Sequence, residues 1–520
     1  MLKTVLNEKW VVFLIVLAGF GGMLFFYSPT DNWSWDPSYY YAQIRSPIIE
    51  NDLDFRNETE THGIATKVTV TGLQGSPWPI GPGILWSPFF LLAHVLVLMI
   101  NPARATGFTS PYIALVSFSS ALYGLAGLFV LYKTCRIYAE KYISFLTVLL
   151  CLGATPLFYY IFRQPIMAHS TGFLVAAMLF LYYLLLMGER TSRKWSGLGF
   201  GVLLGLNFLM RWSGILFVIF PMTYFAREII RAFRAKDSPE VRRLVVQIVL
   251  AGVSFGLTIS PQLALWQRLY ANFLVMPQGT NTFVASILPL NIFKVFFDTN
   301  RGILFWCPFV LIGMLGIFRI PNREIRISTA ICVFSQVVLI GYRNDWYSGG
   351  GFGARYFIEL LPLLAVGFVC LVEGFSLKPV GQKLLAVLAL VLIAHQAVLV
   401  YAVEQAINGW LDFRNYLDGA PLGLSWQVES FIRLVKNPGL WLAPQPYVDQ
   451  RRQAILVNLA GGVRDYFTYL IPATAALLTP LAAWAGMWIR KHVTHFPVPV
   501  LLSGVILYML GWAVYLLLVG

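Results

Sequence analysis

Charged residues are scarce in this chain. Only 12% of its 520 residues are Asp, Glu, Lys or Arg, whereas a soluble globular protein carries roughly a quarter. Apolar side chains take their place, making up 58% of the residues and giving a mean hydropathy of +0.68. This composition excludes an ordinary soluble domain and predicts an integral membrane protein.

Cysteine and acidic residues are also few, and each shortage excludes a class of site or partner. The five cysteines lie in or beside apolar runs without metal-type spacing, which argues against disulfides and structural zinc. The 24 acidic residues face 38 Lys and Arg, for a formal net charge of +14. Because most basic residues fall in short segments between apolar stretches, this charge indicates membrane topology, and we expect no nucleic-acid partner.

Long apolar runs are abundant. At about 20 residues per spanning helix, there are fourteen candidates: residues 10–27, 80–100, 111–132, 142–162, 170–187, 197–210, 212–226, 244–266, 302–318, 326–343, 356–374, 384–403, 469–489 and 497–518. The second candidate contains Pro82, Pro88 and His94, which suit a re-entrant or interfacial helix better than a lipid-facing span. Its exclusion leaves about thirteen spanning helices.

The distribution of basic residues orients these helices. If 80–100 does not cross, the cytoplasmic loops contain 21 of the 38 Lys and Arg, in residues 1–9, 133–141, 188–195, 227–243, 319–326, 375–383 and 490–495. That excess follows the positive-inside rule. We therefore predict a cytoplasmic amino terminus and a carboxyl terminus on the outside.

An arginine interrupts the apolar stretch 197–226. One long helix would bury Arg211 near the middle of the membrane, at a cost of at least about 2.5–3.5 kcal/mol. Two shorter helices would instead place it at the outer surface, between the basic loops 188–195 and 227–243. The sequence thus predicts a helical hairpin with Arg211 at its turn.

Polar residues gather on the predicted outer face. This face comprises a first loop 28–110, a turn 162–170, a loop 267–301, a turn 343–357 and a long loop 404–468. Six arginines lie at or near helix ends there: Arg163, Arg211, Arg268, Arg301, Arg343 and Arg355. Because the topology rule disfavours cations on this side, their presence indicates a function.

Motifs in these loops resemble a known family. The first loop contains "DPSYYY" at 36–41, "ENDLDFRNE" at 50–58 and "PWPIGPGILWSPFF" at 77–90, and "RQPIMAHS" and "GGGFGARYF" follow later. In order and spacing these motifs resemble the GT-C superfamily of membrane glycosyltransferases, which includes protein O-mannosyltransferases, lipid A aminoarabinose transferases and the oligosaccharyltransferase catalytic subunit. The resemblance implies an all-α polytopic GT-C fold with interfacial helices in the first outer loop. Its expected parts are a catalytic core 1–403, an extracytoplasmic loop 404–468 and carboxyl-terminal helices 469–520.

The resemblance also implies a reaction. It is the inverting transfer of a sugar from a polyprenyl-phosphate donor to a glycan, lipid or protein acceptor, on the extracytoplasmic face of the inner (plasma) membrane. The attacking hydroxyl must lose a proton, which a carboxylate can accept, and Asp36 corresponds to the catalytic aspartate of the family. Guanidinium forks match phosphate oxygens, so the donor phosphate is expected to contact Arg163, Arg211, Arg301 and Arg355. Substrate contacts are expected from Tyr40, Arg45, His169, Tyr356 and Glu359.

Simpler alternatives exist for each assignment. Asp36 could only cap a helix, the arginines could be membrane anchors, and His169 could be a helix-end residue, a substrate contact or a ligand. No spacing dictates a metal site, so a divalent cation is left open. The run from Gly349 to Gly353 favours a tight turn over a phosphate loop because it lacks the lysine.

The class of protein also has alternatives. A transporter or flippase of a lipid-linked or polar solute would suit many spans and a re-entrant segment, and a non-catalytic assembly scaffold is a third reading. No inverted repeat is visible, and polar residues crowd one face, which favours the enzyme. We expect a monomer embedded in membrane lipids.

Overall fold

The described part of the chain is helical. A computed structural model describes residues 17, 35–64, 68–191, 193–279, 282–286, 288–374, 379–407, 424–436 and 498–519. In these residues the regular structure is all α-helix, 3-10 helix or π-helix, apart from two isolated β-bridges. The predicted all-α class is therefore confirmed, whereas the predicted helices 10–27 and 469–489 and most of the loop 404–468 lie outside the described residues.

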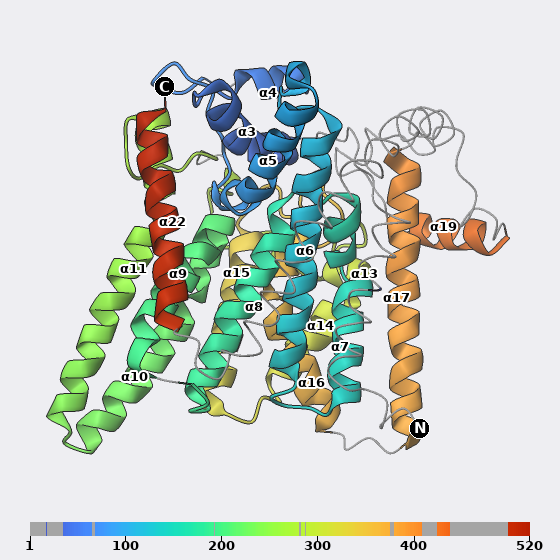
Figure 1. The fold of residues 1–520 in the computed structure, drawn as a ribbon. Helices are drawn as coiled ribbons and strands as arrows, with labels where there is room; N and C mark the ends of the chain where they lie inside the picture. The colour runs from blue at the N-terminus through green and yellow to red at the C-terminus, as the bar shows by residue number, and fades with distance from the viewer. Residues whose placement is uncertain are drawn as a thin grey trace.

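Long helices form a bundle, and α19 projects to one side of it beyond α17 (Figure 1). At one end Figure 1 places α3 (Trp35–Arg45), α4 (Arg56–Thr61) and α5 (Gly81–Ile100). The longer helices that follow are α6 (Ser110–Cys135), α7 (Lys141–Gly153), α8 (Ala168–Met187), α9 (Ser196–Met210), α10 (Ile219–Arg234), α11 (Ser238–Tyr270), α14 (Pro308–Ile317), α15 (Arg323–Gly341), α16 (Leu361–Glu373), α17 (Pro379–Ile407), α19 (Leu424–Lys436) and α22 (Val498–Leu518). The short connecting helices are η1 (Ser46–Glu50), η2 (Pro102–Arg104), η3 (Tyr159–Arg163), η4 (Arg193–Trp195), η5 (Trp212–Val218), α12 (Ile292–Phe297), α13 (Ile303–Trp306) and η7 (Arg355–Leu360).

Nine helices of the described residues are long and apolar enough to cross a membrane: Gly81–Ile100, Ser110–Cys135, Ala168–Met187, Trp212–Arg234, Ser238–Tyr270, Arg323–Gly341, Arg355–Glu373, Val380–Val403 and Leu501–Leu518. The chain is thus a multi-pass helical membrane protein. The number thirteen and the orientation of the termini stay predictions. The segment predicted to be interfacial is the continuous helix α5, which meets the length criterion, so its interfacial position also stays a prediction.

The chain does break at Arg211, as predicted. Helix α9 ends at Met210, and Arg211 is extended, with φ −154° and ψ 142°. Beyond it, η5 turns back against the end of α9, because the amide of Asn207 donates to the carbonyl of Gly214 at 3.1 Å. The guanidinium of Arg211 is therefore carried at a turn between two helices and not inside one long helix.

Small residues allow α9 to approach α11 closely. A Cβ added to Gly197 would lie 1.9 Å from the Gln247 carbonyl oxygen, and one added to Gly201 would lie 2.0 Å from the hydroxyl of Ser254. Helices in membranes associate through such backbone approaches, because lipid removes the hydrophobic drive for association. This packing holds α9 against α11, and Arg211 follows the last residue of α9.

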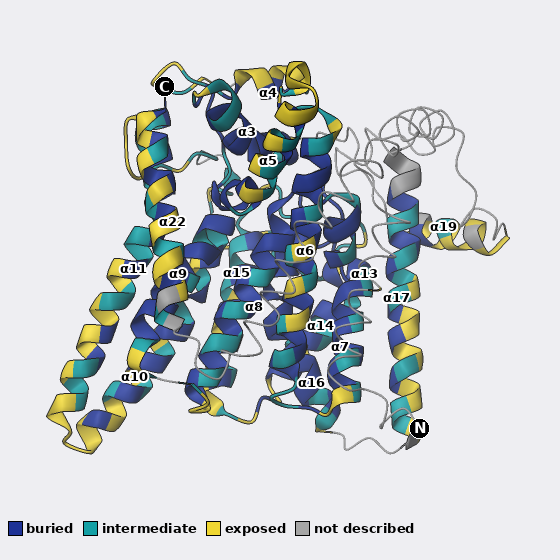
Figure 2. Ribbon diagram, in the orientation of Figure 1, coloured by how far each residue is buried: buried dark blue, intermediate teal, exposed yellow. Residues whose placement is uncertain are grey.

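Burial is greatest in the middle of the bundle (Figure 2). Most residues of α8 and α16 are buried, whereas fewer than a third of those in the apolar windows of α11 and α22 are buried. Exposed apolar helix faces suit contact with lipid, which is as apolar as they are. The hydroxyl of Tyr508 on α22 donates to the Ile84 carbonyl at 3.1 Å, so the last described helix is fixed to α5. The predicted division into core, loop and carboxyl-terminal helices stays a prediction.

A buried ion pair holds the first loop together. The Nη1 of Arg45 lies 2.6 Å from Glu58 and 2.9 Å from Glu50. Its Nε donates to the Thr106 carbonyl at 2.9 Å, and the guanidinium lies 3.8 Å from the ring centre of Phe108. Two carboxylates thus share one guanidinium in a site where Glu58 is fully buried.

This arrangement predicts a pH dependence of stability. Burial raises the pKa of Glu58 from 4.5 to about 7, against the opposing effect of Arg45. Between about pH 4.5 and pH 7 the Glu58 carboxyl keeps its proton in the folded protein but has lost it in the unfolded chain. The stabilisation from this group is therefore complete below about pH 4.5 and is lost as the pH rises through about 7. We expect the melting temperature of wild type to fall between pH 5 and pH 8 by more than that of Glu58→Gln. Equal changes in the two proteins would contradict the assignment.

Candidate functional site

Four separate segments bring charged side chains together. They are the start of α3, the start of α8, the break after α9, and the loop that follows α15 and continues into η7. We call their contributions the charged cluster: Asp36, His169, Arg211, Arg343, Asp345, Arg355, Tyr356 and Glu359. Its members are joined by the contacts described below, so segments remote in sequence converge on one place in the fold.

Asp36 and Arg355 form the first contact of the charged cluster. An Nη1 of Arg355 lies 2.7 Å from Oδ2 of Asp36. Asp36 is in the first turn of α3, where Pro37 follows it, and its side chain is 16% exposed. Arg355 is 8% exposed, so its charge is largely removed from solvent and depends on this carboxylate.

His169, Glu359 and Arg211 form the second contact. The Nδ1 of His169 lies 3.0 Å from Glu359 Oε1, and an Nη1 of Arg211 lies 3.1 and 3.3 Å from the two ring nitrogens. Because a guanidinium can only donate, the imidazole must accept at one nitrogen and is therefore neutral here. Gly172, one turn along α8, makes room for the carboxylate, since a Cβ there would lie 3.2 Å from Glu359 Oε1. His169 thus connects a carboxylate to an arginine.

Tyr356 is at the centre of the arginines. The guanidinium carbons of Arg211 and Arg343 each lie 5.2 Å from its ring centre, and that of Arg355 lies 5.7 Å away. The hydroxyl donates to Asp345 Oδ2 at 2.9 Å. Cations over an aromatic face are attracted by its quadrupole, so one ring helps to hold three like charges close together.

Arg343 and Asp345 form a two-pronged ion pair beside Tyr356. The Nε and Nη2 of Arg343 donate to the two carboxylate oxygens at 2.7 and 2.9 Å. Burial raises the pKa of Asp345, but the hydrogen bonds and charge of Arg343 outweigh it, and the pKa lies below its ordinary value. Asp345 therefore remains ionised and positions both Arg343 and Tyr356. Sequence reasoning did not assign either residue of this pair to the site, although they stand together in "RNDWYSGGGFGARYF".

Tyr40 lies next to the charged cluster. Its ring stacks on Trp78, with ring centres 6.0 Å apart, and meets Trp86 edge-on. Burial raises the pKa of Tyr40 well above its usual value, and the charges of Arg211 and Asp36 act on it in opposite directions. The phenol therefore stays protonated and contributes an aromatic wall to the site.

The other two arginines predicted to contact the phosphate, Arg301 and Arg163, are not members of the charged cluster. Arg301 is 5% exposed, its Nη1 donates to the Gly351 carbonyl at 3.0 Å, and it shares the lining of a cavity of about 10 Å³ with Tyr356. Arg163 is the last residue of η3 and is half-buried. Arg301 thus borders the charged cluster, and its predicted role and that of Arg163 stay predictions.

Arg45 makes its contacts elsewhere. Its partners are Glu50, Glu58, the Thr106 carbonyl and the Phe108 ring, all within the first loop. These contacts hold the loop together, whereas the substrate contact expected of Arg45 from the sequence stays a prediction. No signal in the sequence separated Arg45 from the other outer arginines.

Carboxylates and guanidinium groups nearly balance in and beside the charged cluster. The cations are Arg211, Arg301, Arg343 and Arg355, and the anions are Asp36, Asp345 and Glu359. With His169 neutral, the formal sum is one positive charge, which suits a ligand with one negative charge. Among the described residues no three His, Cys, Asp or Glu side chains are grouped as a metal site.

Gly351 leaves the space that Arg355 fills. A Cβ at this position would lie 2.6 Å from Nε and 2.7 Å from Cζ of Arg355, closer than real Cβ contacts. The run predicted to be a turn is one, with positive φ at Ser348, Gly349 and Gly353 but not at Gly351. An alanine at Gly351 would therefore meet no backbone strain and would only displace the guanidinium.

We expect Gly351→Ala to lower several-fold the sugar transfer that the sequence resemblance implies, because Arg355 would lose its place beside Asp36. Steady-state transfer assays over a range of donor concentrations would measure the effect. The matched control is Gly252→Ala on α11, where a Cβ meets nothing within 4 Å. Equal activity of the two variants would contradict the proposed importance of this packing.

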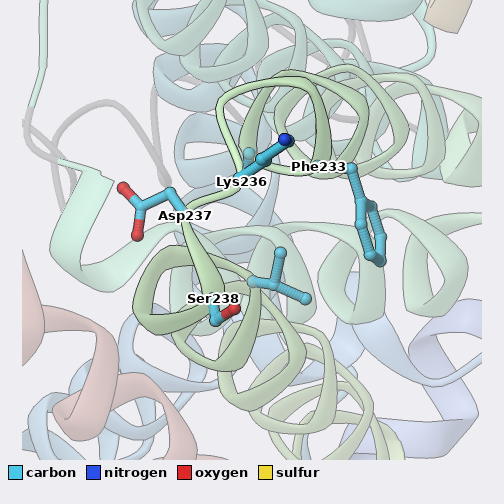
Figure 3. Close-up of a pocket in the computed structure, with 6 residues that line it drawn as sticks. Phe233, Lys236, Asp237 and Ser238 are labelled. Carbon is cyan, nitrogen blue, oxygen red and sulfur yellow. The ribbon is translucent and has the colours of Figure 1, made fainter.

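A second cavity lies far from the charged cluster. It has a volume of about 130 Å³ at the turn between α10 and α11 and is lined by Ala232, Phe233, Lys236, Asp237, Ser238 and Val241 (Figure 3). Figure 1 places this turn at the end of the bundle opposite α3. None of the predicted site residues lines it.

Known proteins resemble this chain in sequence and in fold. Residues 90–260 match the family model described as dolichyl-phosphate-mannose-protein mannosyltransferase. No curated protein matches the chain. Among solved structures, ArnT from Cupriavidus metallidurans bound to undecaprenyl phosphate is 14% identical, with a TM-score of 0.46, over 99% of this chain and 77% of that one.

The oligosaccharyltransferase of Archaeoglobus fulgidus, in a complex with Zn and sulfate, is also 14% identical. Its TM-score is 0.42, over 79% of this chain and 57% of that chain. This protein therefore spans less than two thirds of the length of the archaeal enzyme. The match of residues 90–260 to the mannosyltransferase family model agrees with the resemblance seen in the sequence motifs.

Proposed function

We propose that this protein transfers a sugar from a polyprenyl-phosphate carrier to a glycan, lipid or protein acceptor, on the extracytoplasmic face of the inner (plasma) membrane. The observation that carries the proposal is the 2.7 Å contact between Asp36 and Arg355. It places a carboxylate that can take a proton beside a cation that can hold a phosphate. The family match supports the type of donor.

In the proposed reaction the acceptor oxygen bonds to the anomeric carbon as the bond from that carbon to the phosphate oxygen breaks. The electron pair of the broken bond leaves with the phosphate, and the acceptor proton passes to the Asp36 carboxylate. Attack opposite the leaving group inverts the anomeric centre. A positioned general base contributes typically 10²–10⁴-fold to such a step.

The arginines act on the leaving group. A lipid phosphate that departs gains negative charge, and donors already in place stabilise that charge without reorganisation. Arg211, Arg343 and Arg355 surround the ring of Tyr356, so their positions are set before the donor arrives. Bidentate guanidinium contacts would also fix the orientation of the phosphate.

The other charged and polar side chains of the charged cluster position its arginines. Glu359 and His169 hold Arg211, and Asp345 holds Arg343 and Tyr356. Tyr40, which stacks on Trp78, lies one helical turn after Asp36 on α3 and packs beside the charged cluster. Convergence of Asp36, Arg211 and Arg355 in one cluster supports an enzyme over a transporter, which would need such groups along a path through the bilayer.

The test is a donor panel. The purified protein in lipid nanodiscs would be incubated with polyprenyl phosphates carrying different hexoses and pentoses, together with a cell-envelope extract as the source of acceptor. Mass spectrometry would follow loss of the sugar and appearance of the free polyprenyl phosphate. We expect at least one donor to lose its sugar, and to do so only when the extract that supplies the acceptor is present. The absence of turnover with every donor would reject the proposal.

A further inference from the structure

Arg355 has one carboxylate partner and unused capacity for another. Its Nη1 contacts Asp36 at 2.7 Å, while its Nε is buried and has no hydrogen-bond partner among the described residues. The neighbouring arginines of the charged cluster are held by other groups: Arg343 by Asp345, and Arg211 by His169 and Glu359. Arg355 is therefore the arginine whose counter-ion is also the proposed base.

The charge of that counter-ion disappears during the proposed reaction. When Asp36 accepts the proton of the acceptor hydroxyl, its carboxylate becomes neutral, and Arg355, 8% exposed, loses its partner. A buried cation without a partner is strongly unfavourable. In the same step the phosphodiester of the donor becomes a monoester and gains the negative charge that Asp36 loses. The sum of charges around Arg355 is thus conserved only if the phosphate replaces the carboxylate.

We propose that Arg355 is exchanged between Asp36 and the donor phosphate, pairing with the carboxylate when the site is empty and with the phosphate as the sugar departs. This inference rests on the proposed function. Asp36 then has two successive tasks: it occupies the phosphate subsite of the empty protein, and it takes the proton once the phosphate has displaced it. The base is released only when a donor is bound, which protects a bound acceptor from activation in its absence.

The exchange predicts the sign of an affinity change. An asparagine at position 36 imitates the neutral, protonated carboxylate, so it should leave Arg355 free for the phosphate. We expect Asp36→Asn to bind farnesyl phosphate, a short prenyl phosphate without sugar, about tenfold more tightly than wild type, within the usual range for coupled sites. If Asp36 only positions Arg355, the same substitution should leave the affinity unchanged or weaken it.

Binding would be measured by thermophoresis in nanodiscs, with farnesol as the uncharged ligand. The matched control is Asp54→Asn, which removes the same charge from the first loop, where Asp54 pairs with Arg56 at 2.6 Å. We expect tighter binding only for Asp36→Asn and only with the phosphate. Equal or weaker binding by that variant would overturn the exchange, as would an equal gain in Asp54→Asn.

A measurement on wild type covers the case in which the variant does not fold. Carbodiimide coupling of an amine to Asp36, located by peptide mass spectrometry, should increase when farnesyl phosphate displaces the carboxylate, and farnesol should have no effect. Unchanged labelling would overturn the exchange. A wild type that binds farnesyl phosphate no better than farnesol would instead reject the phosphate site, and with it the proposed function.

Discussion

Asp36→Asn is expected to reduce sugar transfer by roughly 10²-fold or more, because an amide cannot accept the proton of the acceptor hydroxyl. The substitution is nearly isosteric, and the amide oxygen can still accept the hydrogen bond that Arg355 donates to Asp36 at 2.7 Å. The protein should therefore remain folded and inserted. Transfer from a polyprenyl-phosphate donor, followed by mass spectrometry, would measure the loss.

The control for this substitution is Asp54→Asn, since Asp54 belongs to the same loop and pairs with Arg56. Its activity should stay close to that of wild type. Wild-type turnover by Asp36→Asn would remove Asp36 from the role of general base. Together with the affinity measurement, the variant separates the two proposed tasks, because transfer should fall while binding of the prenyl phosphate tightens.

Arg211→Lys and Arg355→Lys are each expected to lower kcat/KM for the donor by roughly 10- to 100-fold, the value of a lost hydrogen bond to a charged group. Lysine keeps the positive charge but not the planar fork that grips two phosphate oxygens at once. Thermal stability should stay close to normal, because a lysine can still pair with Asp36 or Glu359. A titration of each variant with the donor would measure the change in kcat/KM.

The matched control is Arg433→Lys on α19, where the guanidinium pairs with Glu429 and is half exposed. An arginine that only reaches toward lipid headgroups can be replaced by lysine, which has similar reach. We therefore expect no change in donor use there. If Arg211→Lys and Arg355→Lys behaved like this control over the whole titration, both residues would be membrane anchors.

Hydropathy and charge determined much of the fold. The predicted helices 111–132 and 170–187 correspond to α6 and α8, and the predicted break at Arg211 is present. These features follow from local properties: apolar side chains favour lipid over a stretch of about 20 residues, and an arginine resists burial there. The predicted helix 142–162 was less accurate, because α7 ends at Gly153 and the π-helix η3 follows.

The partners of each charged residue were decided by the tertiary structure alone. Asp36 and Arg355 are 319 residues apart in sequence, and His169 and Glu359 are 190 apart. In the sequence Arg45 and Arg355 look alike, yet the first joins Glu58 in the first loop and the second joins the charged cluster. Hydropathy places a residue at a depth in the membrane. An ion pair also needs two charged side chains within about 3 Å of each other, and that depends on which helix ends pack together. Glycine contacts such as those of α9 with α11 set that packing.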